Sequence, residues 1–206
     1  MSRRLYQRLR VVVAWLCRRL YRVEAEGAGN IPRSGGFLLA ANHDSSIDPA
    51  LVALTTERPI RFLARAELWQ PGLRRMLDAL GAIPVRRGEG DHAALERAGD
   101  LLEAGEVVAI FPQGSVLRVR SRRYRRGAAR LALMTGAPIV PVRLFGTAAA
   151  FSLIPPRLGF PKLRVVVGEP LPVRRQEPTR EAATELTEAL ESAIADLAPE
   201  SAPDGA

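Results

Sequence analysis

The sequence is short of the residues that most often bind metals or form disulfide bonds. Its 206 residues include a single cysteine, Cys17, and two histidines, His43 and His92. One cysteine excludes a disulfide bond within the chain and fits a reducing compartment. Two distant histidines and one cysteine do not make a zinc site. We therefore expect chemistry that uses no metal ion.

Lysine and aromatic residues are also scarce, although the chain is strongly basic. Lys162 is the only lysine among 30 basic residues, and with 22 acidic residues the net charge is +8 and the pI about 11.0. This excess favours an anionic partner, such as a lipid surface, a phosphorylated substrate or nucleic acid. Aromatic residues make up 5% of the chain, which leaves too few stacking platforms for a nucleic-acid-binding domain. We expect no nucleic-acid partner.

The N-terminal segment lacks an apolar run long enough to cross a membrane. Residues 3–22 predict a helix whose charge-free run, Val11–Cys17, has seven residues against the roughly 20 that a bilayer requires. Arginines bracket this run, and Arg18-Arg19 is a poor cleavage site for a signal peptide. We interpret residues 1–22 as a basic amphipathic helix on a membrane surface, with Trp15 at the level of the headgroups. The alternative is a helix packed on its own domain.

Beyond this arm, strand-like runs alternate with helical patterns. The predicted strands are 22–26, 36–41, 60–64, 82–86, 107–111, 139–143 and 163–168. The predicted helices are 49–56, 71–80, 91–104, 126–135 and 180–197, the last with Thr179 as its N-cap. This alternation predicts an α/β fold, with a mixed, mostly parallel sheet of about seven strands flanked by helices. Residues 23–197 form one domain in this interpretation, and residues 198–206 a disordered tail.

His43 and Asp48 are the first candidates for chemistry. His43 follows the predicted strand 36–41, and Asp48 precedes Pro49 at a predicted helix start, where aspartate suits the N-cap. Open α/β sheets bind their ligands at such strand ends. A carboxylate on one imidazole nitrogen would leave the other nitrogen free as a base. The alternative is that Asp48 only caps the helix and that His43 hydrogen-bonds to a loop.

No protein nucleophile accompanies this pair. Cys17 lies in the N-terminal arm, and Ser45 and Ser46 lack the Gly-x-Ser-x-Gly surroundings of a hydrolase nucleophile. A base without a nucleophile indicates activation of a substrate hydroxyl for direct attack. The other histidine, His92, falls in the first turn of the predicted helix 91–104, and we expect it to be exposed and non-catalytic.

Two further motifs suit the binding of anions. "FPQGSV", residues 111–116, follows a predicted strand, and its Pro-x-Gly-Ser turn exposes N–H groups that can cradle a phosphate or an oxyanion. "GAIPVRRG", residues 81–88, ends a short strand with Arg86 and Arg87, and paired guanidinium groups suit a phosphate.

In this order along the chain, the motifs resemble those of the glycerolipid acyltransferases of the 1-acylglycerol-3-phosphate (lysophosphatidic acid) type. Asn42-His43 with Asp48-Pro49 is similar to the family's Asn-His, four residues, Asp signature. Residues 81–87 resemble its second block, with Arg87 on the closing arginine. Residues 111–115 resemble the Phe-Pro-Glu-Gly-Thr block, and residues 137–142 the fourth block. Four blocks in the right order are more specific than any one alone.

The resemblance implies direct acyl transfer to a lysophospholipid in phospholipid biosynthesis. His43 would take the proton of a glycerol hydroxyl as it attacks the thioester of acyl-CoA or acyl carrier protein, and Asp48 would orient the histidine. N–H groups near Gly114 would stabilise the oxyanion, and Arg87 would hold the acceptor's phosphate. No metal or bound cofactor is implied. The expected location is the cytoplasmic face of the cell membrane, as a peripheral or monotopic protein.

The sequence departs from the family pattern in the third block. Gln113 replaces a glutamate, and Val116 replaces an arginine that would touch the acceptor's phosphate. The expected acceptor is 1-acylglycerol-3-phosphate; the alternatives are a different polar lipid, or a catalytically inactive lipid-binding relative. The residues assigned to substrate binding are Arg87, Gln113, Gly114, Ser115 and Arg118.

A run of arginines follows the third block. Residues 118–130 include seven of them. Such a run is either a solvated face or a landing patch for anionic lipid, coenzyme A phosphates or acidic acyl carrier protein.

Overall fold

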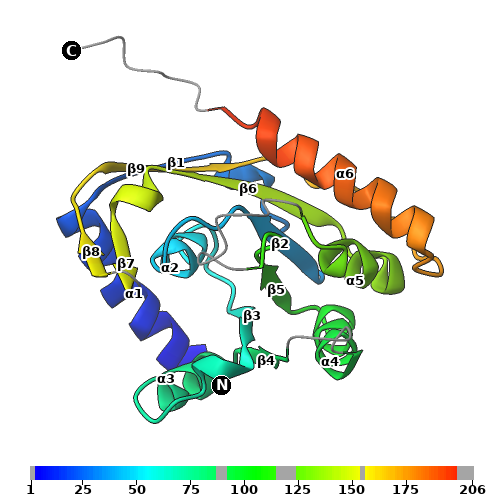
Figure 1. The fold of residues 1–206 in the computed structure, drawn as a ribbon, viewed down its shortest axis with the longest axis horizontal. Coiled ribbons are helices and arrows are strands. Elements are labelled where there is room, and N and C mark those ends of the chain that lie inside the picture. The colour runs from blue at the N-terminus through cyan, green and yellow to red at the C-terminus, as the bar shows by residue number, and fades with distance from the viewer. Residues whose placement is uncertain (1–2, 87–91, 115–123, 154–155, 199–206) are drawn as a thin grey trace.

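A seven-stranded mixed sheet forms the centre of the computed structural model, which describes residues 3–86, 92–114, 124–153 and 156–198. The strands follow the order β1-β9-β6-β2-β5-β3-β4 across the sheet (Figure 1). The predicted α/β class and the seven predicted strands are confirmed. The strands are β1 Arg22–Glu26, β2 Phe37–Ala41, β3 Ile60–Arg65, β4 Ile83–Val85, β5 Val107–Ile110, β6 Ile139–Phe145 and β9 Lys162–Val167.

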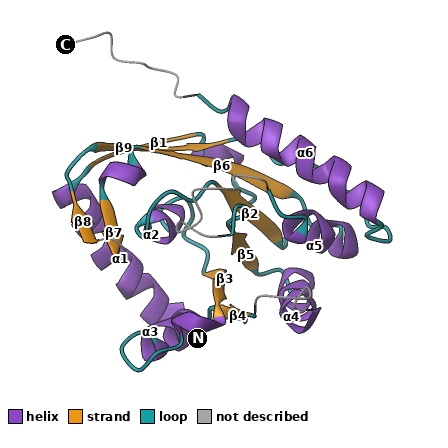
Figure 2. Cartoon of the chain, viewed as in Figure 1, coloured by secondary structure: helices purple, strands orange, loops and turns teal. Residues whose placement is uncertain are grey.

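Helices cover both faces of the sheet (Figures 1 and 2). One face carries α1 (Arg3–Leu20) and α2 (Asp48–Val52), and the other carries α4 (His92–Glu103), α5 (Gly127–Thr135) and α6 (Arg180–Asp196). The remaining helix, α3 (Arg74–Leu80), contacts α1 near the β4 edge. The predicted N-cap of α6 is confirmed, because the Thr179 hydroxyl accepts the N–H of Ala182 at 3.2 Å.

The central strand β2 shows why its apolar sequence predicts a buried strand. All five of its residues are buried. Phe37, Leu39 and Ala41 point to the α1–α2 face, whereas Leu38 and Ala40 point to the face of α4, α5 and α6. A strand covered on both faces carries a continuous apolar run, as parallel strands commonly do. The site described below is built at the end of this strand.

The sheet reverses direction at β9. The strands β6, β2, β5, β3 and β4 pair in parallel, whereas β9 pairs antiparallel with β6, and β1 pairs in parallel with β9. In the chain, a small hairpin of β7 (Phe151–Leu153) and β8 (Pro156–Leu158) follows β6 and precedes β9. Sequence analysis missed this hairpin because each strand has three residues and the second begins with proline.

The helix α1 has one face on the domain and one face in solvent. Tyr6 and Cys17 are buried, and Cys17 packs with Val13 in the core on the α1–α2 side of the sheet. The opposite face exposes Val11, Val12, Trp15, Leu16 and Leu20. Residues 3–20 are therefore packed on residues 23–197, and they keep an apolar face outside. Among the helices that the structure describes, none is both long enough and apolar enough to cross a membrane.

The reactivity of Cys17 reports this packing. Its side chain is 5% exposed, and burial raises the pKa of the thiol. Because the thiolate is the reactive form, a maleimide should label the folded protein at least about tenfold more slowly than the chain in urea at the same pH. Mass spectrometry gives an unambiguous readout, since the chain has one cysteine. Equal rates in the two states would mean that α1 leaves the domain readily.

Candidate active site

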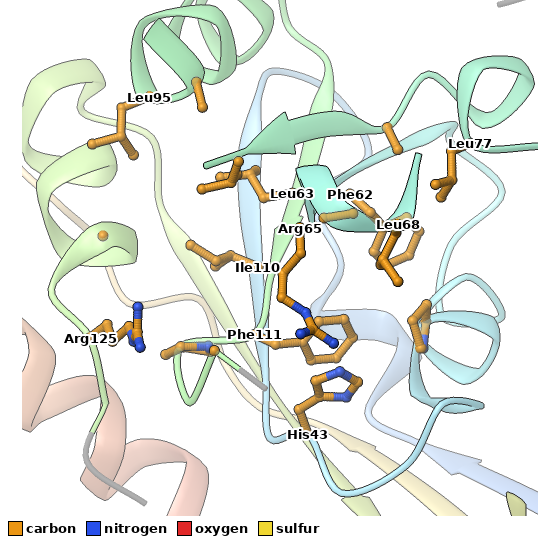
Figure 3. A pocket seen from close by; sticks show the side chains of 18 of the residues that line it. His43, Phe62, Leu63, Arg65, Leu68, Leu77, Leu95, Ile110, Phe111 and Arg125 are labelled. Carbon is orange, nitrogen blue, oxygen red and sulfur yellow. The ribbon is translucent and has the colours of Figure 1, made fainter. Parts of the chain in front are cut away.

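Four segments with candidate residues end at the same edge of the sheet. The strand β2 leads into His43, β5 into residues 111–114 and β4 into Arg86, while β3 ends at Arg65. Because these strands run parallel, their carboxyl ends meet, and this edge is where α/β sheets bind ligands. A cavity of about 1090 Å³ opens there, and its walls include His43, Arg65, Arg86 and Phe111 (Figure 3).

His43 and Asp48 form a direct hydrogen bond. His43 Nδ1 and Asp48 Oδ2 lie 2.8 Å apart, with the Asp48 side chain fully buried and the His43 side chain 16% exposed. An ionised carboxylate has no proton to give, so Nδ1 donates and Nε2 keeps its lone pair. Because His43 lines the cavity, this lone pair can accept the proton of a bound hydroxyl. Of the two interpretations of the spacing, the structure matches the base held by a carboxylate.

The prediction that Asp48 is the N-cap of α2 is wrong. The N-cap is Ile47, and the helix begins at Asp48 without a side-chain cap. Asp48 Oδ2 instead accepts three hydrogen bonds, from His43 Nδ1 and from the backbone N–H groups of Asp44 at 2.7 Å and Ser45 at 2.8 Å. Three charge-assisted bonds outweigh the single N–H that a cap would satisfy. The carboxylate thus folds the loop 43–48 around itself.

Asn42 fixes the start of this loop. Its side-chain Oδ1 accepts the backbone N–H of Leu144 at 2.7 Å, and its Nδ2 donates to the Leu144 carbonyl at 3.0 Å. This pair of bonds extends the β2–β6 pairing by one residue with side-chain atoms. Nδ2 also donates to Asp44 Oδ2 at 2.8 Å. Asn42 is therefore a positioning residue, a role that the motif alone did not reveal.

Aromatic stacking fixes the plane of the His43 ring. Phe111, the residue after β5, stacks on His43 with ring centroids 4.2 Å apart and an interplanar angle of 22°. Phe62 in β3 stacks on Phe111 with centroids 6.4 Å apart. Offset stacking of this kind holds a ring in one orientation and shields one of its faces from water. The imidazole can therefore present its edge to the cavity in a single orientation.

Gln113 binds the catalytic loop. Its Oε1 accepts the backbone N–H of His43 at 2.7 Å, which ties the turn after β5 to the loop after β2. This bond gives Gln113 a positioning role, and its predicted role in substrate binding stays a prediction. An amide oxygen accepts an N–H as a carboxylate oxygen does, so the replacement of the family's glutamate preserves this contact.

Gly114 lines the cavity, and its assignment to substrate binding stays a prediction. Its N–H donates to the Phe111 carbonyl at 2.9 Å and closes the turn, so it is not a donor free for an oxyanion. Its φ of 80° lies in the left-handed region, and a Cβ there would approach Arg125 Nε to 3.0 Å. Glycine thus permits the turn and lets the Arg125 side chain pack over it.

The bond from Gln113 predicts the effect of two substitutions. Gln113→Glu keeps an acceptor for the His43 N–H and should hold kcat within about threefold of wild type. Gln113→Leu removes the acceptor and should lower kcat about tenfold with little change in the KM of either substrate, because it loses one partly buried hydrogen bond. Steady-state kinetics with both substrates varied measures this split. A large change in acceptor KM with kcat unaltered would return Gln113 to substrate binding.

Some predicted residues lie outside the part of the chain that the structure describes. These are Arg87, Ser115 and Arg118. Arg86, next to Arg87, is exposed and lines the cavity. His92 is exposed in the first turn of α4, as predicted.

Arg65 is a site residue that sequence analysis missed. It ends β3, and Figure 3 shows its side chain reaching down to Phe111 and His43. Its side chain is partly buried, and within the described residues it has no acidic partner. A guanidinium group next to the base suits a phosphate or a developing oxyanion. The available signal was its position directly after the predicted strand 60–64.

Taken together, the site is a histidine base held by a buried carboxylate, with a neighbouring cation and a large cavity. The arrangement is that of an enzyme that activates a hydroxyl for attack. A family model described as "Acyltransferase" matches residues 22–144. The chain belongs to this acyltransferase family.

Named relatives agree with this assignment. A Bacillus subtilis protein named 1-acyl-sn-glycerol-3-phosphate acyltransferase is 30% identical over 82% of this chain and 84% of its own length. A protein of the same name from Borreliella burgdorferi is 33% identical over 59% of this chain, which spans 50% of that relative. The fold is similar to the crystal structure of the 1-acyl-sn-glycerophosphate acyltransferase of Thermotoga maritima, with a TM-score of 0.71 and 24% identity over 92% of this chain and 77% of that one.

Proposed function

We propose that this chain transfers an acyl group from a thioester to the free hydroxyl of 1-acylglycerol-3-phosphate. The hydrogen bond from His43 Nδ1 to Asp48 Oδ2 carries the proposal, because it leaves Nε2 as a base in the cavity. The hydroxyl oxygen attacks the thioester carbonyl as Nε2 takes its proton, and a C–O bond replaces the C–S bond. The departing thiolate then recovers the proton from the imidazolium. The base and the two substrates balance this reaction without a metal or a bound cofactor.

The apolar wall of the cavity suits acyl chains. Leu68, Leu73, Leu77 and Leu80 line the cavity on the side of β3 and α3 (Figure 3 labels Leu68 and Leu77). A volume of about 1090 Å³ reaches the upper end of the range of small-molecule sites, which fits a substrate with a long chain. This apolar wall and His43 line the same cavity, which supports the binding of an acyl chain next to the base.

Positive charge close to His43 suits the acceptor's phosphate, which lies only a few bonds from the attacked hydroxyl. Arg65 supplies it among the described residues, and Arg87 remains the residue that the family resemblance assigns. Gln113 was one reason to consider a different acceptor. Its bond to the His43 backbone weakens that reason, because the substitution then acts on the loop. Val116, the other departure from the family pattern, lies outside the described residues. We therefore favour 1-acylglycerol-3-phosphate over another polar lipid.

The direct test is acyl transfer from labelled acyl-CoA, or acyl carrier protein, to 1-acylglycerol-3-phosphate in mixed micelles. His43→Ala should lower kcat by about 10³-fold, because general base catalysis contributes on this scale. His92→Ala removes the chain's other histidine, which is exposed on α4 and outside the cavity, and should leave kcat unchanged. Arg65→Gln should raise acceptor KM or lower kcat.

The outcomes separate the candidate functions. Transfer lost in His43→Ala and kept in His92→Ala supports the enzyme. Transfer that prefers another lysolipid over 1-acylglycerol-3-phosphate would refute the acceptor. No transfer with either donor, together with normal lipid binding, would identify a catalytically inactive lipid-binding relative.

The enzyme works at the membrane surface in this proposal, on the cytoplasmic side. The support is the outer face of α1, where Val11, Val12 and Trp15 are each more than half exposed. Phe160, which is 64% exposed, adds to this surface next to Tyr21, with ring centroids 6.1 Å apart. A contiguous exposed apolar patch beside arginines is typical of helices that lie in the lipid interface.

Two matched substitutions test this surface. Val12→Asp places a charge on the exposed face of α1, whereas Ala189→Asp places the same charge on an exposed position of α6. Val12→Asp should weaken co-sedimentation with vesicles containing phosphatidylglycerol about tenfold, because it removes a buried apolar contact with lipid and adds repulsion. Ala189→Asp should bind as wild type does. Equal binding of the two variants would contradict the proposed role of α1.

A further inference from the structure

The inner face of α1 brings polar groups to the apolar part of the cavity. Tyr6, Arg10 and Val13 line the same cavity as the leucines on the side of β3 and α3. Figure 1 shows α1 passing beside α3, and the two helices are in contact. Tyr6 and Arg10 are neighbours on one face of α1, because their positions are i and i+4 in the helix. A wall that only holds hydrocarbon needs neither a cation nor a hydroxyl, so these two side chains require a separate explanation.

The contact of Arg10 with α2 gives its position along the cavity. Arg10 Nε donates to the Ala53 carbonyl at 3.3 Å, and Ala53 itself lines the cavity with other residues of α2. The helix α2 begins at Asp48 and ends at Ala53, so the two residues are separated by about 8 Å along its axis. Because Asp48 holds His43, Arg10 lies well away from the reacting carbonyl and beside the middle of a bound acyl chain.

Most of the hydrogen-bonding capacity of Arg10 is unused. A guanidinium group offers several N–H donors, and the Ala53 carbonyl accepts from one of them. Across the part of the chain that the structure describes, Arg10 has no ion pair, and its two Nη groups have no hydrogen-bond acceptor. An arginine that only covers apolar surface turns its head to water, whereas this head is bound to a second helix of the cavity wall. The remaining donors suit an acceptor atom inside the cavity.

The Tyr6 hydroxyl is a second donor without an acceptor. Tyr6 is 3% exposed, and its hydroxyl is buried with no hydrogen-bond partner among the residues that are described. Burial raises the pKa of this hydroxyl, although the Ile60 backbone and the positive charges of Arg10 and Arg61 lower it in part. The group therefore stays protonated and able to donate. A buried hydroxyl without a partner lowers stability, and a ligand oxygen beside Arg10 would supply the missing acceptor.

We infer that this part of the cavity binds an acyl chain that carries an oxygen atom, such as a hydroxyl, near its middle. The inference rests on the proposed acyl transfer, because it concerns the acyl group of the donor in that reaction. Arg10 and Tyr6 both donate hydrogen bonds, so the oxygen of the chain accepts from them. The leucines of the same cavity contact the methylene groups on either side of that oxygen.

Two other occupants match these donors less well. The acceptor's phosphate is only a few bonds from the attacked hydroxyl, so it has to lie close to His43, where Figure 3 shows Arg65. Arg10 instead contacts the other end of α2. An unsubstituted chain would cover both donors without bonding to either. A site built to hydrogen-bond a polar group discriminates against the analogue that lacks it, because its own polar groups are then left unpaired.

Three acyl groups test the inference in the full-length protein, as thioesters of coenzyme A or acyl carrier protein and with 1-acylglycerol-3-phosphate as acceptor. They are stearoyl, 10-hydroxystearoyl and 2-hydroxystearoyl, the last with its hydroxyl beside the thioester. The variants are Tyr6→Phe, which removes one oxygen atom, and Arg10→Met, which keeps an unbranched side chain without charge. The matched controls are Tyr21→Phe, at a buried tyrosine outside the cavity, and Arg8→Met, at an exposed arginine of α1 outside the cavity.

The wild type should use 10-hydroxystearoyl with a kcat/KM about tenfold above that for stearoyl, because the hydroxyl supplies an acceptor to two donors that lack one. Tyr6→Phe and Arg10→Met should each lower this ratio about tenfold, whereas the two controls should keep it. The hydroxyl of 2-hydroxystearoyl should bring no such gain. If Arg10→Met does not fold, Tyr6→Phe decides. A wild-type preference for stearoyl, a ratio that the folded variants leave unchanged, or a rise in acceptor KM in Arg10→Met would overturn the inference.

A binding measurement separates this inference from the proposed reaction. Methyl stearate and methyl 10-hydroxystearate, which have no free carboxylate for Arg10, compete with a fluorescent fatty acid for the cavity. Tighter binding of the hydroxylated ester that is lost in Tyr6→Phe supports the chain site even if 1-acylglycerol-3-phosphate is not acylated. Conversely, transfer to 1-acylglycerol-3-phosphate that favours stearoyl, with both esters bound equally, would refute the chain site and leave the proposed function intact.

Discussion

One carboxylate oxygen organises the active site. Asp48 Oδ2 accepts the imidazole N–H of His43 and two backbone N–H groups of the loop that joins β2 to α2. A buried carboxylate has to be satisfied by donors, and all three that reach Oδ2 come from the segment that carries the base. The position of His43 is therefore coupled to the burial of Asp48. If the histidine moved, the buried carboxylate would lose a hydrogen-bond donor or become exposed to water. Two more strands act on the same loop, since Asn42 binds β6 and Gln113 reaches in from the end of β5.

Several arginines at the candidate active site have no acidic partner among the described residues. Some arginines elsewhere in the described parts of the chain form ion pairs, as Arg61 does with Glu106 at 2.6 Å. At the edge where the parallel strands end, Arg65 and the arginines at the starts of α5 and α6 have no such partners among the residues that the structure describes. In the proposed function, the phosphate of the acceptor supplies negative charge at this edge. The net charge of +8 thus has a local explanation as well as a compositional one.

The sheet could be predicted from the sequence because its signal is local. Runs such as Phe37–Ala41 are apolar throughout, and that pattern follows directly from burial on both faces. The role of Asp48 could not be predicted in this way, because an aspartate at a helix start is commonly the N-cap. The three donors that Asp48 binds instead are brought together only when the loop is folded. The partner of Gln113 depends on β5 lying next to β2, which strand order alone determines. Arg65 was missed for a similar reason, since its position directly after the predicted strand 60–64 points to the site only once the strand order is known.

In the proposed function, α1 links the membrane surface to the chemistry. Val12 and Trp15 are exposed on its outer face, whereas Tyr6, Arg10 and Val13 line the cavity from its inner face. One helix therefore forms a wall of the cavity that holds His43 and also presents apolar side chains to the outside. A lipid chain that contacted the exposed apolar face of α1 would be separated from the cavity by the thickness of a single helix, about 10 Å. In the proposed function, the acceptor can therefore reach the base without leaving the lipid surface fully.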